Sequence, residues 1–280
     1  MVNFKSKLIS QCLAEMIGLA LILFMGAGCV SVAVVSGATM GIWEICIIWG
    51  ITFALAIYLT AGVSGAHLNP AVTIALWLCA GFDKRKVLPY IFAQMAGGFI
   101  GAALAYLCYF SLFEAYEVTH SIVRGSEESL VLASIFSTYA NPNITVAHAA
   151  VIEVLITAIL MMLIMALLDD KNGLPKGPLA PLLIGLLVAV IGGATAPLTG
   201  FAMNPARDFG PKLFTFFAGW GEMSFTGGRD IPYFLVPLIA PVLGAFLGAK
   251  LYLAAFDKIL SGNKAEEKEF AEQNEKLINI

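Results

Sequence analysis

The chain has 280 residues, of which 59% are hydrophobic and only 12% are charged, and its formal net charge is −3. Ordinary soluble domains have roughly 25% charged residues, so this composition excludes most soluble folds. It also excludes disorder, which requires low hydrophobicity and high charge. The small negative charge gives no basic footprint for nucleic-acid binding. The composition therefore indicates a protein embedded in a membrane.

Six apolar stretches are long enough to cross a bilayer, which takes about 20 helical residues. We expect these spans near 9–35, 42–62, 87–112, 145–168, 178–198 and 233–256. The first span follows two lysines, as a signal peptide would. It is too long for one, carries Glu15 and lacks a clear cleavage site, so we expect it to be retained. We expect the segment at 113–144 to be an outer loop.

The basic residues are distributed unevenly between the spans. If both termini lie in the cytoplasm, the inner segments hold 12 of the 16 Lys and Arg residues. The outer segments then hold only Arg124, Arg207, Lys212 and Arg229. Because cytoplasmic loops carry an excess of Lys and Arg, this asymmetry predicts cytoplasmic termini.

The five cysteines all lie in apolar runs, and no Cys-x-x-Cys or Cys/His spacing is present. They are Cys12, Cys29, Cys46, Cys79 and Cys108. We interpret them as small buried apolar residues and not as disulfides or metal ligands. No pattern suggests a metal, cofactor, nucleotide or catalytic site.

Two further apolar segments, near 64–80 and 199–217, do not fit the six-span count as crossings. Each contains an Asn-Pro-Ala triplet, at Asn69, Pro70 and Ala71 and at Asn204, Pro205 and Ala206. Asn is a strong helix N-cap, and Pro is favoured at the next position. A helix from Asn69 to Ala80 would be about 18 Å long, which is roughly half of a ~30 Å hydrocarbon core. We therefore expect two re-entrant half-helices that meet end to end.

The chain also repeats itself. Glu15 precedes Asn69 by 54 residues, and Glu153 precedes Asn204 by 51. Each half has three spans and one hairpin, and an odd number of spans inverts the second half in the membrane. The predicted fold is an all-α membrane protein with an inverted internal repeat. We expect one channel domain at 1–256, with repeats near 9–112 and 145–256, and a charged cytoplasmic tail at 257–280.

The residues before each triplet are expected to be extended and to line a cavity, because unpaired backbone is tolerated in a bilayer only there or inside protein. Their carbonyls would line a pore. These residues are Gly65, Ala66, His67 and Leu68 in the first hairpin and Gly200, Phe201, Ala202 and Met203 in the second. Two facing helix N-termini would each place roughly +0.5 charge near the midplane. That arrangement predicts a pore for small neutral polar solutes that excludes cations and interrupts proton chains.

Glu15 and Glu153 lie at matching positions inside apolar spans. A buried carboxylate must find partners, and repeat symmetry favours hydrogen bonds to the hairpin backbone over a role as proton carrier.

At these residues the sequence resembles the aquaporin, or major intrinsic protein, family. The Ser64–Thr73 and Gly200–Asp208 segments carry the similarity most densely, with Phe225–Tyr233 resembling the aquaglyceroporin branch of bacterial glycerol uptake facilitators. The resemblance implies a right-handed helical bundle, a homotetramer with one pore per subunit, and a location in the bacterial inner membrane. It also implies glycerol and small polyols as permeants, with some water.

The resemblance further implies which residues form the outer constriction. Where water channels have Phe, His and a small residue beside an Arg, the glycerol branch has Trp, Gly, Phe and Arg. The matching positions here are Trp49, Gly192, Phe201 and Arg207. The two rings would supply an apolar wall, and the Arg207 guanidinium would supply fixed donors for hydroxyl groups. Asp208 also matches the branch and would neutralise Arg207 or orient the loop.

Three other functions remain as alternatives to a passive channel. A proton-coupled transporter would use Glu15 or Glu153 as its carrier. A membrane-embedded enzyme would need a catalytic set that the sequence does not offer. A non-conducting scaffold of the same fold would have a blocked pore.

Overall fold

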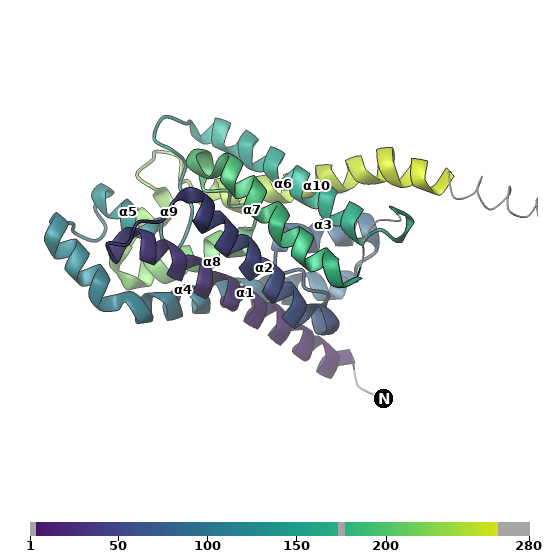
Figure 1. Ribbon diagram of the computed structural model, residues 1–280, viewed down its shortest axis with the longest axis horizontal. Coiled ribbons are helices and arrows are strands. Elements are labelled where there is room, and N and C mark those ends of the chain that lie inside the picture. The colour runs from purple at the N-terminus through teal and green to yellow at the C-terminus, as the bar shows by residue number, and fades with distance from the viewer. Residues whose placement is uncertain (1–3, 173–176, 263–280) are drawn as a thin grey trace, which may run out of the picture.

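The computed structural model describes residues 4–172 and 177–262, and within these residues the chain is helical with no strand. Six helices are long and apolar enough to cross a membrane, as expected. They are α1 (Phe4–Val35), α2 (Ile42–Ser64), α4 (Lys84–His120), α6 (Val146–Leu168), α7 (Ala180–Thr199) and α10 (Leu235–Leu251). The helices lie side by side in one bundle (Figure 1).

The expected span boundaries are wrong at two places. Helix α4 continues to His120 instead of ending at 112, so the expected outer loop begins eight residues later. The extension persists because Phe113 is fully buried and stacks on Phe136 with ring centroids 5.5 Å apart. The rest of that loop contains the short helix α5 (Leu130–Ala133).

The C-terminal helix is also longer than expected. Helix α10 is followed by a π-helical turn, Tyr252–Asp257, and the helix runs on to residue 262 (Figure 1). Most of the tail that we expected at 257–280 lies outside the described residues.

Two short helices begin at the Asn-Pro-Ala triplets. They are α3 (Pro70–Ala80) and α8 (Pro205–Thr215), each of 11 residues. As expected, the side-chain oxygen of Asn69 accepts the Ala71 N–H at 2.8 Å, and that of Asn204 accepts the Ala206 N–H at 3.0 Å. At about 1.5 Å per residue each helix is about 16 Å long. That the two segments re-enter the bilayer from opposite faces stays a prediction.

Glycines allow close helix packing both between the two halves of the chain and within each half. Gly50 on α2 and Gly185 on α7 each lie against the other's backbone carbonyl. Gly97 on α4 lies against the Met16 carbonyl of α1, and Gly244 on α10 lies against the Val154 carbonyl of α6. Small residues allow close backbone approach between membrane helices. The equivalent pairs α1–α4 and α6–α10 thus pack in the same way, with a glycine of one helix against a backbone carbonyl of the other.

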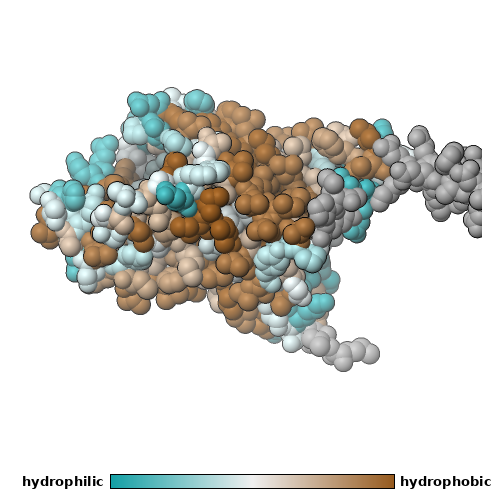
Figure 2. Space-filling view, in the orientation of Figure 1, coloured by the Kyte–Doolittle hydropathy of each residue, from teal (hydrophilic) through white to brown (hydrophobic). Residues whose placement is uncertain are grey.

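The outer surface of the bundle is apolar over its middle. Figure 2 shows hydrophobic residues across the central part, with hydrophilic residues gathered toward the ends. Large side chains such as Phe92 and Leu107 are 70% and 71% exposed. A contiguous apolar surface of this extent marks contact with a membrane or a partner, which agrees with the six candidate spans.

We expect Gly97→Ala to lower the thermal unfolding temperature of the detergent-solubilised protein. A Cβ at this position would overlap the Met16 carbonyl, and overpacking of this kind costs about 1–3 kcal/mol. The matched control is Gly62→Ala on the exposed face of α2, where a Cβ meets no atom within 4 Å. Equal unfolding temperatures for the two variants would contradict the close-packing role of Gly97.

Candidate functional site

We expected an extended backbone before each Asn-Pro-Ala triplet. The structure instead has residues of positive φ there. Ala66 and Leu68 have φ values of 51° and 50°, and Phe201 and Met203 have 43° and 50°. The residue between each pair, His67 or Ala202, has negative φ, whereas Gly65 and Gly200 just before each pair also have positive φ. Left-handed geometry costs a non-glycine residue roughly 1–2 kcal/mol, so the surrounding structure must hold these loops in place.

Glu15 lies beside the first of these loops and is fully buried. Its carboxylate accepts the backbone N–H groups of His67 at 3.0 Å and Leu68 at 2.6 Å. The Ser64 hydroxyl and the Gln94 amide also donate to it, at 2.6 and 2.7 Å. Glu15 therefore satisfies two donors that the loop could not satisfy within itself.

Glu153 makes the equivalent contacts in the second half. It is also fully buried, and its carboxylate accepts the N–H groups of Ala202 and Met203, both at 2.9 Å. The Thr199 hydroxyl donates to it at 2.7 Å. The two glutamates hold the two loops in the same way, which is the geometry that a supporting role requires.

The two short helices meet through their capping asparagines. The Asn69 side-chain amide donates to the Met203 carbonyl at 2.9 Å, and the Asn204 amide donates to the Leu68 carbonyl at 2.7 Å. Each amide has two N–H donors, so one remains for a solute. The loops are thereby joined crosswise, each to the cap of the other.

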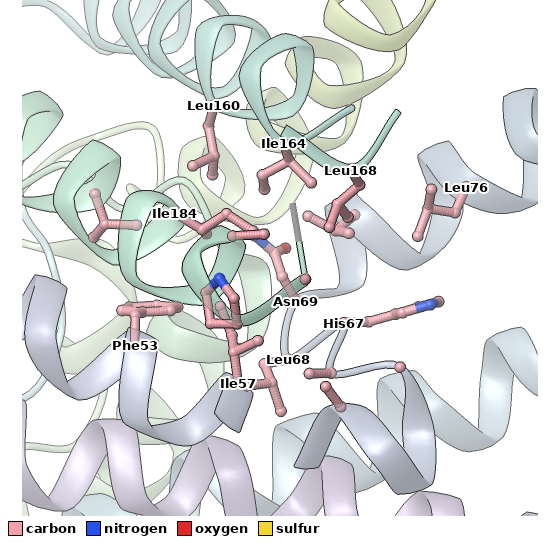
Figure 3. Close-up of a pocket in the computed structure, with 18 residues that line it drawn as sticks. Phe53, Ile57, His67, Leu68, Asn69, Leu76, Leu160, Ile164, Leu168 and Ile184 are labelled. Carbon is pink, nitrogen blue, oxygen red and sulfur yellow. The ribbon is translucent and has the colours of Figure 1, made fainter. Parts of the chain in front are cut away.

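A cavity of about 250 Å³ opens on one side of this junction. All four residues of the first loop, 65–68, line it, together with Asn69. Its other walls are mainly apolar side chains of α2, α3, α6 and α7, several of which are labelled around Asn69 in Figure 3. The cavity thus combines one polar strip, formed by the loop and Asn69, with apolar walls.

A much smaller space of about 20 Å³ lies on the other side of the junction. It is lined by Trp49, Phe201, Arg207 and Asn204, among others. Four residues border both spaces, namely Phe53, Asn69, Leu160 and Val188. These shared residues place the two spaces on one path. A single water needs roughly 10–15 Å³ of such volume, so the smaller space is a constriction on that path.

Arg207 is held in this constriction from two sides. Its Nη1 donates to the Phe136 carbonyl at 3.1 Å, and its guanidinium carbon lies 4.3 Å from the Trp49 ring centroid. The Trp49 and Phe201 rings meet edge to face, 6.4 Å apart. Gly192 does not line the space directly, but a Cβ there would lie 3.0 Å from the Phe201 ring. The four expected residues are thus brought together.

The other expected site residues differ in whether they border one of these two spaces. Among the predicted carbonyl positions, Gly200 does not border either space, whereas Phe201, Ala202 and Met203 border the constriction. His67 borders the wide cavity, and its Nδ1 lies 3.1 Å from the Thr73 hydroxyl. The Pro and Ala residues of the triplets belong to the first helical turns. All four are buried, namely Pro70, Ala71, Pro205 and Ala206.

Sequence reasoning missed a buried ion pair behind the constriction. The Lys212 ammonium lies 2.7 Å from the Asp208 carboxylate, and both side chains are at most 1% exposed. Asp208 also accepts the Thr138 N–H and hydroxyl, both at 2.6 Å, while Lys212 donates to the Thr138 carbonyl at 2.8 Å. Asp208 therefore pairs with Lys212 and not with Arg207. The i, i+4 spacing of opposite charges in an apolar segment was the available signal.

The ion pair fixes the loop at 136–138, which holds Arg207. Thr138 is two residues from Phe136, whose carbonyl accepts the Arg207 hydrogen bond. Helix α8 thus anchors the segment 136–138 through Asp208 and Lys212, and that segment in turn orients the guanidinium of the same helix.

The cysteine expectation is only partly met. All five are free, as expected, but only Cys29 and Cys46 are buried, while Cys108 is exposed. Cys108 lies on α4, whose outward face is apolar surface of the bundle. No group of three or more His, Cys, Asp and Glu residues suited to a metal ion occurs within 4–172 and 177–262.

Residues 3–252 match the family model described as Major intrinsic protein. The chain belongs to this family. A propanediol uptake facilitator of Salmonella typhimurium is 65% identical over 92% of this chain and 97% of its own length. A glycerol uptake facilitator of Escherichia coli K12 is 60% identical over 98% and 99%. An aquaglyceroporin structure from Plasmodium falciparum superimposes with a TM-score of 0.80 at 28% identity, covering 91% of this chain and 99% of that one.

Family membership confirms the resemblance inferred from the sequence and the all-helical channel fold. This family member is a transport protein and not an enzyme. Its six apolar helices and its bacterial relatives make it a bacterial multi-pass membrane protein.

We expect Lys212→Met to destabilise the protein strongly, because Asp208 would remain buried without its partner. Breaking one side of a buried pair costs roughly 3–5 kcal/mol, and thermal unfolding in detergent measures the loss. Lys258→Met, at an exposed lysine, is the matched control. The double variant Asp208→Asn/Lys212→Met should recover part of the loss; no recovery would contradict the pairing.

Proposed function

We propose that this protein is a passive channel for glycerol and other small neutral polyols, which also passes some water and excludes ions and protons. One observation carries the proposal: aromatic rings and fixed polar donors line the same narrow constriction. Trp49 and Phe201 supply the apolar wall, and Arg207 and Asn204 supply the donors. A polyol has a carbon edge and a hydroxyl edge, so it can contact the rings and the donors at the same time.

Trp49, Gly192, Phe201 and Arg207 form the selectivity filter in this proposal. Gly192 leaves room because it adds no side chain beside the Phe201 ring. The carbonyls of the two loops and the amides of Asn69 and Asn204 then carry the hydroxyl groups through the junction. Solutes without hydroxyl groups lose these hydrogen bonds and gain nothing in return.

Ion and proton exclusion follows from the charges at the junction. Two helix N-termini, at Pro70 and Pro205, meet there, and each contributes roughly +0.5 charge. Arg207 adds a full positive charge nearby. Cations are repelled by these positive charges. The amide donors of Asn69 and Asn204 orient water at the junction, so a chain of proton-carrying hydrogen bonds is interrupted there.

The relatives support polyols as the permeant class. Their names specify glycerol in one case and propanediol in the other. The two solutes differ by one hydroxyl group, and both fit an amphipathic constriction. We further propose a homotetramer in the inner membrane with both termini in the cytoplasm, as the excess of inner Lys and Arg residues indicates.

Coupled transport is the main competing function. A proton carrier must exchange its proton with a water-accessible site. Glu15 and Glu153 are both fully buried and occupied by backbone and side-chain donors. These contacts favour a fixed structural role.

The test is stopped-flow light scattering of proteoliposomes under a glycerol or 1,2-propanediol gradient, with empty liposomes as control. We expect fast, protein-dependent re-equilibration that does not saturate with solute concentration. A pH gradient should produce no accumulation, because a channel only equalises concentrations. Accumulation above equilibrium, or no acceleration by a folded protein, would overturn the proposal.

We expect Gly192→His to lower the ratio of glycerol to water permeability by about tenfold. That change corresponds to a free-energy difference of about 1.4 kcal/mol. An imidazole at this position would meet the Phe201 ring and the Cys46 sulfur, so the opening would narrow. Gly62→His, on the exposed face of α2, controls for the introduction of a histidine. An unchanged permeability ratio would remove Gly192 from the proposed filter.

A further inference from the structure

The segment Phe225–Tyr233 resembles the aquaglyceroporin branch, yet the proposed function assigns it no role. It borders neither the wide cavity nor the constriction. In the structure it forms a tight turn before α10, in which the N–H groups of Arg229 and Tyr233 both donate to the Thr226 carbonyl, at 3.3 and 3.2 Å. This turn fixes the base of the Arg229 side chain, so the contacts of that side chain indicate what the segment does.

The Arg229 guanidinium binds three backbone carbonyls of one short segment. Its Nη1 donates to the Ile144 carbonyl at 2.8 Å, and its Nη2 donates to the carbonyls of Ala140 and Asn141 at 3.1 and 2.9 Å. Residues 140–144 form no helix, so their carbonyls need partners from elsewhere in the protein. A planar guanidinium presents its N–H donors in a fixed geometry. Arg229 therefore holds this segment in one arrangement.

The longer segment 136–144 carries the contacts of two arginines, one at each end. At its start the Phe136 carbonyl accepts the hydrogen bond from Arg207 at 3.1 Å. The buried ion pair holds the segment by hydrogen bonds at Thr138. Arg229 holds it beyond that residue. The acceptor that orients the Arg207 guanidinium thus belongs to a segment that depends on both anchors.

The same segment also contacts the loop that carries Phe201. The Asn141 N–H donates to the Leu198 carbonyl at 2.9 Å, close to the end of α7. A Cβ on Gly200 would lie 3.0 Å from the Thr138 side chain, so the segment packs directly on the start of the second loop. A displacement of this segment would therefore reach both the arginine and the aromatic ring of the constriction.

We propose that Arg229 is a positioning residue for the selectivity filter. By holding 140–144 it fixes the width of the opening beside Arg207 and Phe201, and hence the largest polyol that passes. The opening is only about 20 Å³. A single water needs roughly 10–15 Å³, so a gain of that volume would be large relative to the opening. The effect on selectivity rests on the proposed function, whereas the anchoring of the segment does not.

The test is the ratio of glycerol permeability to the permeability of xylitol, a longer linear polyol, measured by stopped-flow light scattering of proteoliposomes. We expect Arg229→Gln to lower this ratio by about threefold, or about 0.7 kcal/mol, because the longer solute gains more from a wider opening. Arg229→Lys keeps the charge but not the planar fork, so it should shift the ratio in the same direction by less. Asp230→Asn, at the adjacent exposed residue, is the matched control. A loss of folded protein would lower both permeabilities together and leave the ratio unchanged.

Hydrogen exchange of backbone amides gives a second measurement, which needs no permeant. Arg229→Gln should speed exchange in peptides from 136–144, where the Asn141 N–H is hydrogen-bonded, and Asp230→Asn should not. Because Thr138 keeps its contacts with the ion pair, we expect the variant to fold; if it does not, Arg229→Lys provides the same comparison.

The two measurements separate the parts of the proposal. Equal exchange in 136–144 with and without the Arg229 side chain overturns the anchoring. Faster exchange with an unchanged permeability ratio overturns the effect on the filter. An unmodified chain that passes neither polyol contradicts the proposed function, and the exchange measurement still decides whether Arg229 holds the segment.

Discussion

The structure depends on satisfying backbone N–H groups where the chain is not helical inside an apolar bundle. Each unpaired group there costs several kcal/mol, because no bulk water is available. Two buried carboxylates, Glu15 and Glu153, meet this demand by accepting two N–H groups each. In the proposed channel, the loop carbonyls are then available to solutes in the lumen. The polar strip of the pore is thus a by-product of how the loops are held.

This constraint also explains why the loops can keep an unfavourable backbone. Four residues with side chains adopt positive φ in two short segments. The strain persists because carboxylates, capping asparagines and neighbouring hydroxyls over-determine each position. Rigid loops suit a channel, since a donor or acceptor that is already in place need not be ordered when a solute arrives.

Much of this arrangement can be predicted from sequence because it rests on local rules. Asn followed by Pro predicts a helix start at each triplet, and the spacing from Glu15 and Glu153 relates the two halves. The alternating φ of Ala66, Leu68, Phe201 and Met203 could not be predicted, because the intrinsic preference of these residues opposes it. The role of Lys212 depends on Thr138, 74 residues away in a loop. The end of α4 depends on tertiary packing of Phe113 and not on the length of an apolar run.

The crossed asparagine bonds also bear on how the protein is made. The Asn69 amide needs the Met203 carbonyl, which is 134 residues later in the chain. At a synthesis rate of about 5–20 residues per second, the partner emerges about 7–27 s after Asn69. During this interval the first hairpin has no second half against which to close. A membrane-insertion machinery or a lipid-shielded intermediate must therefore tolerate a half-finished polar junction, and the order of synthesis makes its closure a late event.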